Sequence, residues 1–314
     1  MVTGGAGFIG SNLADTLLDQ NMEVIAIDNF DSFYDRKIKE NNISRAMDYR
    51  NFHLYRTDIL DHESLEKIFS KHNPDMIVHL AAKAGVRPSI DDPAGYMKTN
   101  IEGTTNLLEL SKTHKIGKFI FASSSSVYGN NKKVPFSETD PVDEPISPYA
   151  ASKKAGELIC YNYHHLYNMN IFALRFFTVY GPRQRPEMAI HKFTRLIDEG
   201  GQVPVYGEGI PRRDFTYITD IIDGIKQAML NVSGFEVINL GESRTISVSD
   251  LITEIENAVG KKAKRVLLPM QPGDVIETFA DVTKAKNLLG YKPSTSIAEG
   301  ISGFTDWYFS QNNK

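Results

Sequence analysis

A tyrosine and a lysine four residues apart are the best candidates in this chain for proton transfer. Tyr149 and Lys153 belong to the segment Tyr-Ala-Ala-Ser-Lys, and residues four apart on a helix lie on the same face. A tyrosine with a pKa of about 10 is a poor base at neutral pH, but a nearby ammonium group favours its phenolate form. The pair therefore predicts an acid/base centre, although the same spacing is also common on ordinary helix surfaces.

Four consecutive serines, at positions 123–126, precede this pair and follow an apolar segment that reads as a strand. We expect them at the same sheet edge as Tyr149. A hydroxyl group there can hydrogen-bond the reacting oxygen of a substrate and pass its proton to Tyr149. Because a polar loop explains most serine runs, this prediction depends on the combination with Tyr149 and Lys153.

A glycine-rich turn near the start of the chain indicates a dinucleotide site. Gly4, Gly7 and Gly10 recur every third residue before a helical stretch, a pattern that permits a tight turn and a close approach of backbone to pyrophosphate. Asp28 ends the next predicted strand, where a carboxylate can accept from the ribose 2′-hydroxyl of NAD and repel the 2′-phosphate of NADP. Either feature alone has an ordinary structural explanation, but together they predict NAD binding.

The order of the predicted elements explains how these residues could meet. Short apolar strands are expected at residues 24–27, 52–55, 76–78 and 119–121, and helices at residues 11–20, 63–72, 96–114 and 148–167. This alternation indicates an α/β fold of the Rossmann type, a doubly wound parallel sheet with helices on both faces. Right-handed crossovers then bring the carboxyl ends of the strands to one edge, where ligands bind.

The chain is expected to divide into two lobes. Residues 1–176 should form the NAD-binding domain, and residues 177–314 a smaller α/β lobe that closes over the sheet edge. A strand near residues 236–240 is expected to return to the main sheet. In the second lobe, helices are predicted at roughly residues 188–199, 219–230, 247–259 and 297–309.

Composition excludes several classes of protein. The 314 residues carry 35 lysines and arginines against 39 aspartates and glutamates, so nothing favours nucleic acid binding. No apolar run approaches the roughly 18 residues of a membrane span, and no signal-peptide pattern is present. The single cysteine, Cys160, excludes an internal disulfide, and the eight histidines show no metal-ligand spacing, so no metal is predicted. We therefore expect a cytoplasmic enzyme acting on small molecules.

The succession of glycine turn, acidic strand end, serine run and Tyr-x-x-x-Lys resembles the extended short-chain dehydrogenase/reductase family, and within it the nucleotide-sugar 4-epimerases. The resemblance covers essentially the whole chain. It implies a tightly bound NAD, a UDP-sugar substrate and a homodimer joined through helices 96–114 and 148–167. It gives the substrate-hydroxyl position to Ser124 and the base to Tyr149, with Lys153 also bonding the nicotinamide ribose.

The same resemblance extends the NAD site beyond the glycine turn. Asp58 and Ile59 follow the third predicted strand and are placed to border the adenine. Residues 79–87 resemble the loop that runs beneath the cofactor phosphates. Besides Tyr149 and Lys153, the expected NAD contacts are Gly4, Gly7, Phe8, Ile9, Gly10, Asp28, Asn29, Asp58, Ile59, Leu80, Ala81, Ala82 and Lys83.

The residues after Ser124 favour epimerisation over related reactions. Dehydratases and UDP-glucuronate decarboxylases of this family carry acidic residues between the hydroxyl position and the Val-Tyr-Gly that follows. Ser125 and Ser126 occupy those positions here, and serine cannot act as a carboxylic acid. A transient 4-keto sugar that is reduced again on its other face is therefore expected, with decarboxylation as a weaker alternative.

Thr178 and Arg185 resemble the arrangement of UDP-glucuronate 4-epimerases. A guanidinium can hold the C5 carboxylate of the sugar bidentately, and we hypothesise that this suppresses loss of CO2 from the β-keto acid intermediate. Arg185 could instead pair with the UDP phosphates or with Glu187. Three alternatives stay open: epimerisation of UDP-glucose, epimerisation of UDP-N-acetylglucosamine, and a non-catalytic NAD-binding regulator.

The remaining expected substrate contacts are less specific. Arg213 matches the phosphate-binding arginine of the family, Tyr206 could pack on the uracil, and Asp274 could accept from the uridine ribose. The complete expected set is Arg87, Ser124, Ser125, Ser126, Tyr149, Thr178, Arg185, Ala189, Phe193, Tyr206, Arg213, Gln271 and Asp274.

Overall fold

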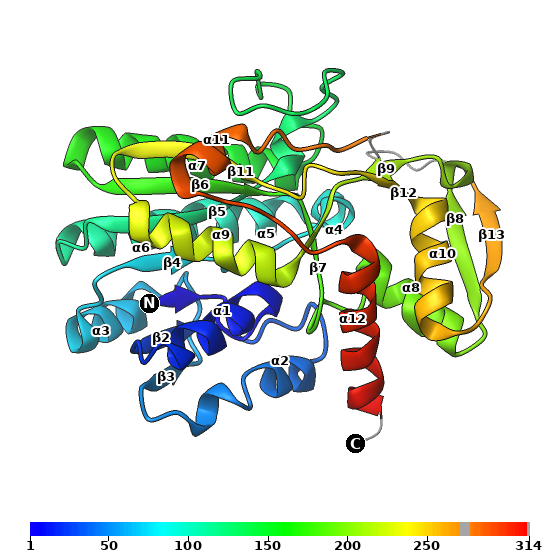
Figure 1. The fold of residues 1–314 in the computed structure, drawn as a ribbon. Coiled ribbons are helices and arrows are strands. Elements are labelled where there is room, and N and C mark those ends of the chain that lie inside the picture. The colour runs from blue at the N-terminus through cyan, green and yellow to red at the C-terminus, as the bar shows by residue number, and fades with distance from the viewer. Residues whose placement is uncertain (270–276, 313–314) are drawn as a thin grey trace.

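The computed structural model describes residues 1–269 and 277–312 (Figure 1). At its centre is a seven-stranded sheet with the order β11-β6-β5-β4-β1-β2-β3, in which neighbouring strands run parallel. The strands are β1 (Val2–Thr3), β2 (Val24–Ile27), β3 (Phe52–Tyr55), β4 (Ile77–His79), β5 (Lys118–Ser124), β6 (Asn170–Phe176) and β11 (Phe235–Leu240). The predicted doubly wound fold is confirmed, with its switch point between β1 and β4.

Helices cover both faces of this sheet. One face carries α1 (Phe8–Asp19), α9 (Ile218–Asn231) and α11 (Thr283–Leu289). The other face carries α3 (His62–His72), α6 (Gly103–Thr113) and α7 (Pro148–Tyr167). Because both faces are covered, the central strands are almost continuously apolar, and all four residues of β2 are buried.

The helix expected at residues 96–114 is a composite rather than one regular helix. Asp92 Oδ1 accepts a hydrogen bond from Gly95 N at 3.0 Å and caps α5 (Pro93–Met97), so the helical run begins earlier than expected. A π-helical turn, Lys98–Glu102, then joins α5 to α6. Turns of this kind are frequent at functional sites, and this one contains the buried residue Asn100.

The helix expected at residues 148–167 has the bounds that the sequence predicts. Ser147 Oγ accepts a hydrogen bond from Ala150 N at 3.1 Å, and Pro148 occupies the first helical position of α7. Both residues favour the start of a helix at this point. The cap therefore fixes Tyr149 in the first turn of α7.

The second part of the chain builds a smaller lobe beside the sheet (Figure 1). Its apolar core lies between α8 (Ala189–Asp198), α10 (Val248–Val259) and α12 (Ile297–Asn312). Short strands pair as β7 (Thr178–Tyr180) with β10 (Phe215–Tyr217), β8 (Gln202–Tyr206) with β13 (Lys264–Leu268), and β9 (Arg212–Arg213) with β12 (Ile246–Ser247). Across the two described ranges, no helix has both the length and the apolar character needed to cross a bilayer.

Candidate active site

The turn between β1 and α1 brings backbone atoms unusually close together. Gly4 has a φ of +68°, and a methyl group on Gly10 would lie 2.1 Å from the Gly4 carbonyl oxygen, so glycine is needed at both positions. Gly7 is the N-cap of α1, and no side chain among the described residues caps that helix end. The first N–H groups of α1 are therefore available to an anion. This cradle fits the pyrophosphate of a dinucleotide.

Asp28 lies at the same sheet edge, directly after β2. Its buried carboxylate accepts hydrogen bonds from Ala6 N at 3.1 Å and from Phe30 N at 2.8 Å. Lys39 Nζ, also buried, lies 3.7 Å from Asp28 Oδ1. Sequence analysis missed Lys39, because the short helix α2 (Arg36–Asn42) carries no motif that places it beside the end of β2. Together the two side chains offer an acceptor and a donor to ribose hydroxyl groups.

The residues expected around the adenine are brought together by the ends of β2 and β3. Asn29 Nδ2 donates to Asp58 Oδ2 at 2.8 Å, which bridges the two strand ends. Ile59 is buried against α6, where a methyl group on Gly103 would lie 2.5 Å from Ile59 Cδ1. Phe8 and Ile9 form the first turn of α1.

Buried polar groups hold the loop that follows β4. His79 Nδ1 lies 2.7 Å from Thr3 Oγ1, and His79 Nε2 lies 3.0 Å from Thr104 Oγ1. Ala81 N donates to Thr3 Oγ1 at 3.1 Å. Burial lowers the pKa of His79 to about 3, so the ring stays neutral and can donate at one nitrogen while it accepts at the other. The backbone of residues 80–82 is therefore fixed at the switch point between β1 and β4.

Asn100 joins this loop to the helices. Its Oδ1 accepts from Lys83 N at 2.8 Å, and its Nδ2 donates to Lys83 O at 3.0 Å and to Ser152 Oγ at 2.9 Å. The π-helical turn directs Asn100 inward, and the sequence carries no signal for such a turn. The ammonium group of Lys83 forms an ion pair with Asp92 at 2.6 Å, so its expected contact with a cofactor remains a prediction.

Ser124, Tyr149 and Lys153 come together where β5 ends and α7 begins. A hydrogen bond links the side chains of Tyr149 and Ser124. Ser124 Oγ also accepts from Ser126 N at 3.2 Å and from Ser126 Oγ at 2.9 Å. Lys153 is buried, and its Nζ donates to Ala122 O at 2.8 Å. The hydroxyl, phenol and ammonium groups therefore meet at one sheet edge.

Burial opposes ionisation of both the phenol and the ammonium group. It raises the pKa of Tyr149, whereas the hydrogen bond with Ser124 and the positive charge of Arg185 lower it. Burial lowers the pKa of Lys153 to about 8. A phenol hydrogen-bonded to a serine hydroxyl can exchange a proton with an oxygen that is bound beside both groups. The arrangement is chemically suited to proton transfer at a substrate hydroxyl.

A buried ion pair between Arg175 and Glu157, which was not predicted from the sequence, connects the elements around Ser124, Tyr149 and Lys153. Arg175 Nε and Nη2, on β6, each donate to the carboxylate of Glu157 at 2.8 Å. Glu157 lies on α7, one turn after Lys153, and also accepts from Ser123 Oγ at 2.6 Å. The guanidinium lies 4.8 Å from the centre of the Tyr128 ring. This network connects β6 to β5 and α7, the two elements that carry Ser124, Tyr149 and Lys153.

Arg185 acts electrostatically on Tyr149. Its charge lowers the pKa of both Tyr149 and Tyr96, whose rings are 6.2 Å apart. Arg185 Nε lies 3.0 Å from Glu187 Oε1, and its guanidinium lies 5.5 Å from the centre of the Phe33 ring. Pairing with Glu187, an alternative that the sequence left open, therefore occurs in this structure. The same guanidinium is close enough to the acid/base centre to influence it electrostatically.

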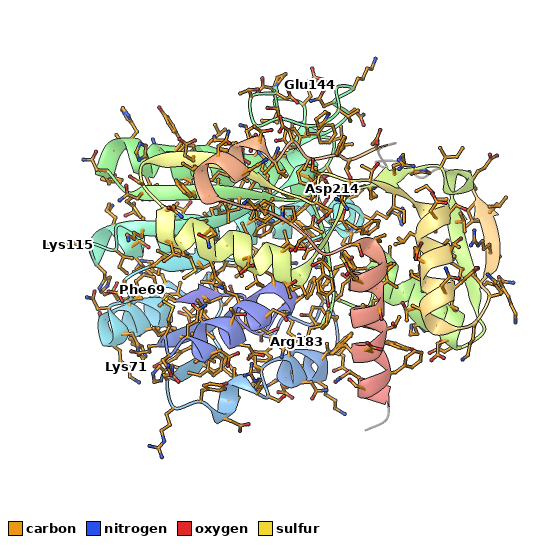
Figure 2. The ribbon with its side chains drawn as sticks, in the orientation of Figure 1. Phe69, Lys71, Lys115, Glu144, Arg183 and Asp214 are labelled. Atoms are coloured by element: carbon orange, nitrogen blue, oxygen red, sulfur yellow. The ribbon has the colours of Figure 1, made fainter. Side chains whose placement is uncertain are left out.

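The loop that carries Arg185 is tethered to the first lobe. Arg183 Nη2, labelled in Figure 2, lies 2.7 Å from Asp15 Oδ2 on α1. Asn12 Nδ2, also on α1, donates to Pro182 O at 3.3 Å. The glycine turn and the Arg185 loop therefore share one helix, α1, as a support.

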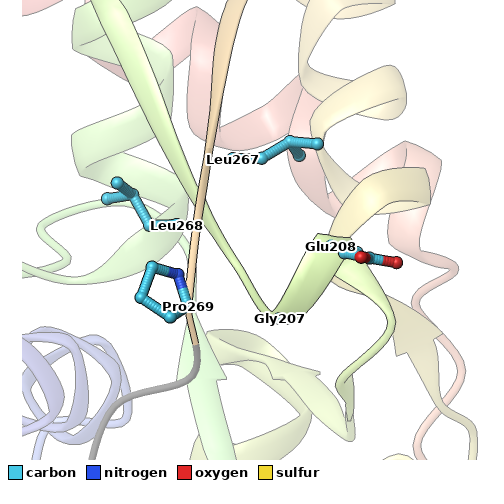
Figure 3. A pocket seen from close by; sticks show the side chains of 5 residues that line it. All are labelled: Gly207, Glu208, Leu267, Leu268 and Pro269. Carbon is cyan, nitrogen blue, oxygen red and sulfur yellow. The ribbon is translucent and has the colours of Figure 1, made fainter.

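Two further predicted substrate residues, one from each lobe, contact each other. The guanidinium of Arg87, which follows the β4 loop in α4 (Val86–Asp91), is 5.2 Å from the centre of the Tyr206 ring. Tyr206 ends β8, next to an open pocket of about 400 Å³ (Figure 3). The pocket is lined by Gly207, Glu208, Leu267, Leu268 and Pro269. The structure thus brings Arg87 and Tyr206 together near a cavity.

The other predicted substrate residues are more scattered. Thr178 N donates to Asp214 O at 3.1 Å. Arg213 Nη1 donates to Arg212 O at 2.9 Å. Of the remainder, Ser125 begins a tight turn after β5, Ala189 begins α8, Phe193 is buried in the core of the smaller lobe, and Gln271 and Asp274 lie outside the described residues.

Comparison with known proteins places the chain in a family. Residues 1–304 match the family described as GDP-mannose 4,6 dehydratase. The UDP-glucuronate 4-epimerase of Thermodesulfobacterium geofontis is 43% identical over 308 residues, which cover 98% of this chain and 95% of that protein.

Two solved structures are also similar over nearly their whole length. The UDP-glucuronic acid 4-epimerase of Bacillus cereus, in complex with UDP-glucuronic acid and NAD, is 39% identical with a TM-score of 0.93, and the match covers 99% of this chain and 98% of that one. The UDP-glucose 4-epimerase of Thermotoga maritima with UDP-glucose is 36% identical with a TM-score of 0.92 and the same coverage. The chain belongs to the GDP-mannose 4,6 dehydratase family of extended short-chain dehydrogenases/reductases, as its motifs predicted.

Proposed function

We propose that this chain is an NAD-dependent UDP-sugar 4-epimerase that converts UDP-glucuronate to UDP-galacturonate. The observation that carries the proposal is that the positive charge of Arg185 reaches Tyr149 and lowers the pKa of its phenol, which is hydrogen-bonded to Ser124. A guanidinium at the acid/base centre suits a sugar that bears a carboxylate. The relatives from Thermodesulfobacterium geofontis and Bacillus cereus, both described as glucuronate epimerases, support this substrate.

The NAD site is assigned to the edge of the sheet at its switch point. Gly4, Gly7 and Gly10 would accommodate the pyrophosphate at the N-terminus of α1, and Asp28 with Lys39 would hold the adenosine ribose. NAD held there would supply the redox chemistry, in which the hydride of C4 of the sugar would be taken up and given back on the opposite face. Because the cofactor is regenerated in each cycle, no net oxidation of the sugar is expected.

The proton moves through side chains of this chain. Ser124 would hydrogen-bond the O4 hydroxyl of the sugar, and Tyr149 would take the O4 proton as C4 becomes a ketone. After the 4-keto sugar has rotated in the pocket, Tyr149 would return the proton to O4. Lys153 would hold the nicotinamide ribose and favour the phenolate through its charge. Ser125 and Ser126 provide no acid for elimination. The 4-keto intermediate would therefore be reduced again rather than dehydrated.

Arg185 and Thr178 would select the uronate. Glu187 Oε1 lies 3.0 Å from Arg185 Nε, and the C5 carboxylate of the substrate would replace Glu187 as the partner of the guanidinium. A carboxylate held by the planar fork of an arginine has a fixed orientation. Loss of CO2 from the 4-keto acid requires the bond between C5 and the carboxylate to overlap the π orbitals of the ketone. An orientation that holds this bond near the plane of the ketone therefore opposes the loss.

The smaller lobe would hold the nucleotide. Arg87 and Tyr206 lie together beside the pocket of the smaller lobe and would contact the diphosphate and the uracil. Arg213, Ala189, Phe193, Gln271 and Asp274 complete the proposed UDP site. On this assignment, residues 1–176 with β11 form the NAD-binding domain, and the rest of residues 177–314 forms the UDP-sugar lobe.

Epimerisation of a neutral sugar is the second candidate. It is favoured by the internal carboxylate of Glu187, which already neutralises Arg185, and by the similarity to the Thermotoga maritima enzyme with UDP-glucose. Incubation of the purified protein with UDP-glucuronate, UDP-glucose and UDP-N-acetylglucosamine, followed by NMR of the anomeric protons, separates the candidates. The proposal predicts formation of UDP-galacturonate without release of CO2.

We also propose that the enzyme acts as a homodimer in the cytoplasm. Apolar side chains protrude from α7: Leu158 is 58% exposed and Leu166 is 55% exposed. Side chains of this kind mark interaction surfaces, and a second copy would cover them. The one cysteine, Cys160, is buried, which suits a reducing compartment. Light scattering should give twice the mass of one chain, and a monomeric mass would contradict the dimer.

A further inference from the structure

The fold brings two histidines and a glutamate together far from the proton-transfer residues. Glu23 directly precedes β2, His53 is the second residue of β3, and His72 ends α3. The nearest side-chain atoms are Glu23 Oε1 and His53 Nε2, 3.2 Å apart, and Glu23 Oε1 and His72 Nδ1, 3.4 Å apart. Sequence spacing gave no hint of this cluster, because each residue comes from a different element.

These separations suit a shared metal ion. All three ligand atoms lie within 4.8 Å of one another. In a tetrahedral site with bonds of about 2.0 Å, neighbouring ligand atoms are about 3.3 Å apart. Two imidazole nitrogens and one carboxylate oxygen form a donor set typical of zinc and related transition metals, and not of Mg²⁺ or Ca²⁺, which prefer oxygen ligands.

Tyr55 supports His72 in the orientation that a metal requires. His72 Nε2 lies 2.8 Å from the Tyr55 phenol oxygen, which also accepts a hydrogen bond from Lys71 Nζ at 3.0 Å. If His72 Nε2–H donates to that oxygen, the lone pair of Nδ1 faces Glu23. A ligating histidine usually donates its other N–H group to an oxygen in this manner. The contact with Tyr55 therefore holds the His72 ring through Nε2, and Nδ1 is left to bind the metal.

The three side chains differ in how far solvent reaches them. The side chain of His72 is 7% exposed. His53 and Glu23 are 37% and 58% exposed, so an ion could enter from solvent and retain water as a further ligand.

We infer that Glu23, His53 and His72 form a binding site for a divalent transition metal, with Zn²⁺ as the best match. The site lies at the amino-terminal edge of β2 and β3, whereas Asp28 and Ser124 lie at carboxyl ends of strands. The elements α3, β2 and β3 lie together at one end of the sheet (Figure 1), and Lys71 marks this region in Figure 2. A bound ion would tie α3 to β3, the edge strand of the sheet, and would stabilise the folded chain by mass action.

Calorimetric titration of the full-length, tag-free protein, holding its NAD, with Zn²⁺ alone tests the site. We expect one zinc per chain, and we expect His53→Ala to abolish that binding. The matched control is His62→Ala, which removes an exposed histidine of the same helix, α3, outside the cluster and should leave binding intact. Tyr55→Phe should weaken binding roughly tenfold, as expected for loss of a group that orients a ligand.

Two further measurements distinguish a built site from incidental binding. Co²⁺ should bind with the visible absorption of a tetrahedral site in the wild type and not in His53→Ala. Zn²⁺ should raise the unfolding temperature of the wild type and of His62→Ala, but not that of His53→Ala. Absence of saturable zinc binding, or equal binding by His53→Ala, would overturn the inference. Neither result depends on which sugar the enzyme uses.

Discussion

The guanidinium of Arg185 is held by Glu187, with Nε 3.0 Å from Oε1, while its charge reaches the phenol of Tyr149. Glu187 is 42% exposed, so the ion pair is partly screened by water and easily exchanged. A substrate carboxylate would have to displace Glu187 to use the same guanidinium. On the proposed function, the pair would link substrate selection to proton transfer at Tyr149.

Replacing Glu187 should strengthen binding of an acidic sugar. In Glu187→Gln we expect the KM for UDP-glucuronate to fall by about two- to fivefold, which corresponds to about 0.4–1 kcal/mol for a half-exposed ion pair. The kcat should change little, because Glu187 does not take part in proton transfer. Steady-state kinetics measure both quantities. The matched control is Glu199→Gln, which removes the partner of Arg195 at 3.2 Å on α8, and an equal effect there would contradict the explanation.

Removing the phenol oxygen should stop the reaction without removing the cofactor. We expect Tyr149→Phe to lower kcat by about a thousandfold, within the usual range for loss of a general acid/base. Ser124→Ala should cause a smaller loss, since Tyr149 remains. The NAD content after purification should equal that of the wild type in both variants. Substantial turnover by Tyr149→Phe would exclude Tyr149 as the base.

The buried pair of Arg175 and Glu157 should be a positioning device for α7. Both side chains are 2% exposed, and loss of one partner of a buried pair leaves an uncompensated charge. Arg175→Met should lower the free energy of unfolding by about 3 kcal/mol. The double variant Arg175→Met with Glu157→Leu should lose less than the sum of the single variants. Denaturant titrations of all four proteins measure this coupling, and simple additivity would argue against a direct interaction.

The first elements of the fold were predictable because their signals are contiguous in the chain. Gly4, Gly7 and Gly10 lie within one turn, and Tyr149 and Lys153 lie on one helix that begins at a recognisable cap. Strands buried on both faces of the sheet are almost wholly apolar, so their positions are clear from short windows of sequence. The serine run was expected at the end of such a strand, and the family resemblance singled out Ser124 within it.

The missed residues depend on tertiary structure. Lys39 reaches Asp28 from a short helix with no distinctive pattern, and Asn100 turns inward because of a π-helical turn. Glu157 and Arg175 look like ordinary surface charges in the sequence, yet the packing of α7 on β6 buries them together. The ion pair between Lys83 and Asp92 was likewise not predictable from the sequence, and the expected contact of Lys83 with the cofactor stays a prediction.

His79 should make the folded protein sensitive to acid. Burial lowers the pKa of His79 to about 3, below the ordinary value of 6.5, so the unfolded chain binds a proton more readily between these values. Its contribution to stability is therefore complete above pH 6.5 and is lost progressively as the pH falls toward 3. Unfolding free energies at several pH values should show the difference between wild type and His79→Gln shrinking as the pH falls from 7 to 4. A difference that does not change with pH would contradict a neutral His79.

The most direct test of glucuronate specificity compares two sugars in one variant. Initial rates of 4-epimerisation of UDP-glucuronate and UDP-glucose should be measured by NMR for the wild type and for Arg185→Ala. We expect the wild type to prefer UDP-glucuronate, and Arg185→Ala to lose about a hundredfold in kcat/KM for this sugar, about 3 kcal/mol for a desolvated charged contact. The rate with UDP-glucose should change far less. Epimerisation of UDP-glucose by the wild type without turnover of UDP-glucuronate, or an equal loss for both sugars in Arg185→Ala, would contradict this expectation.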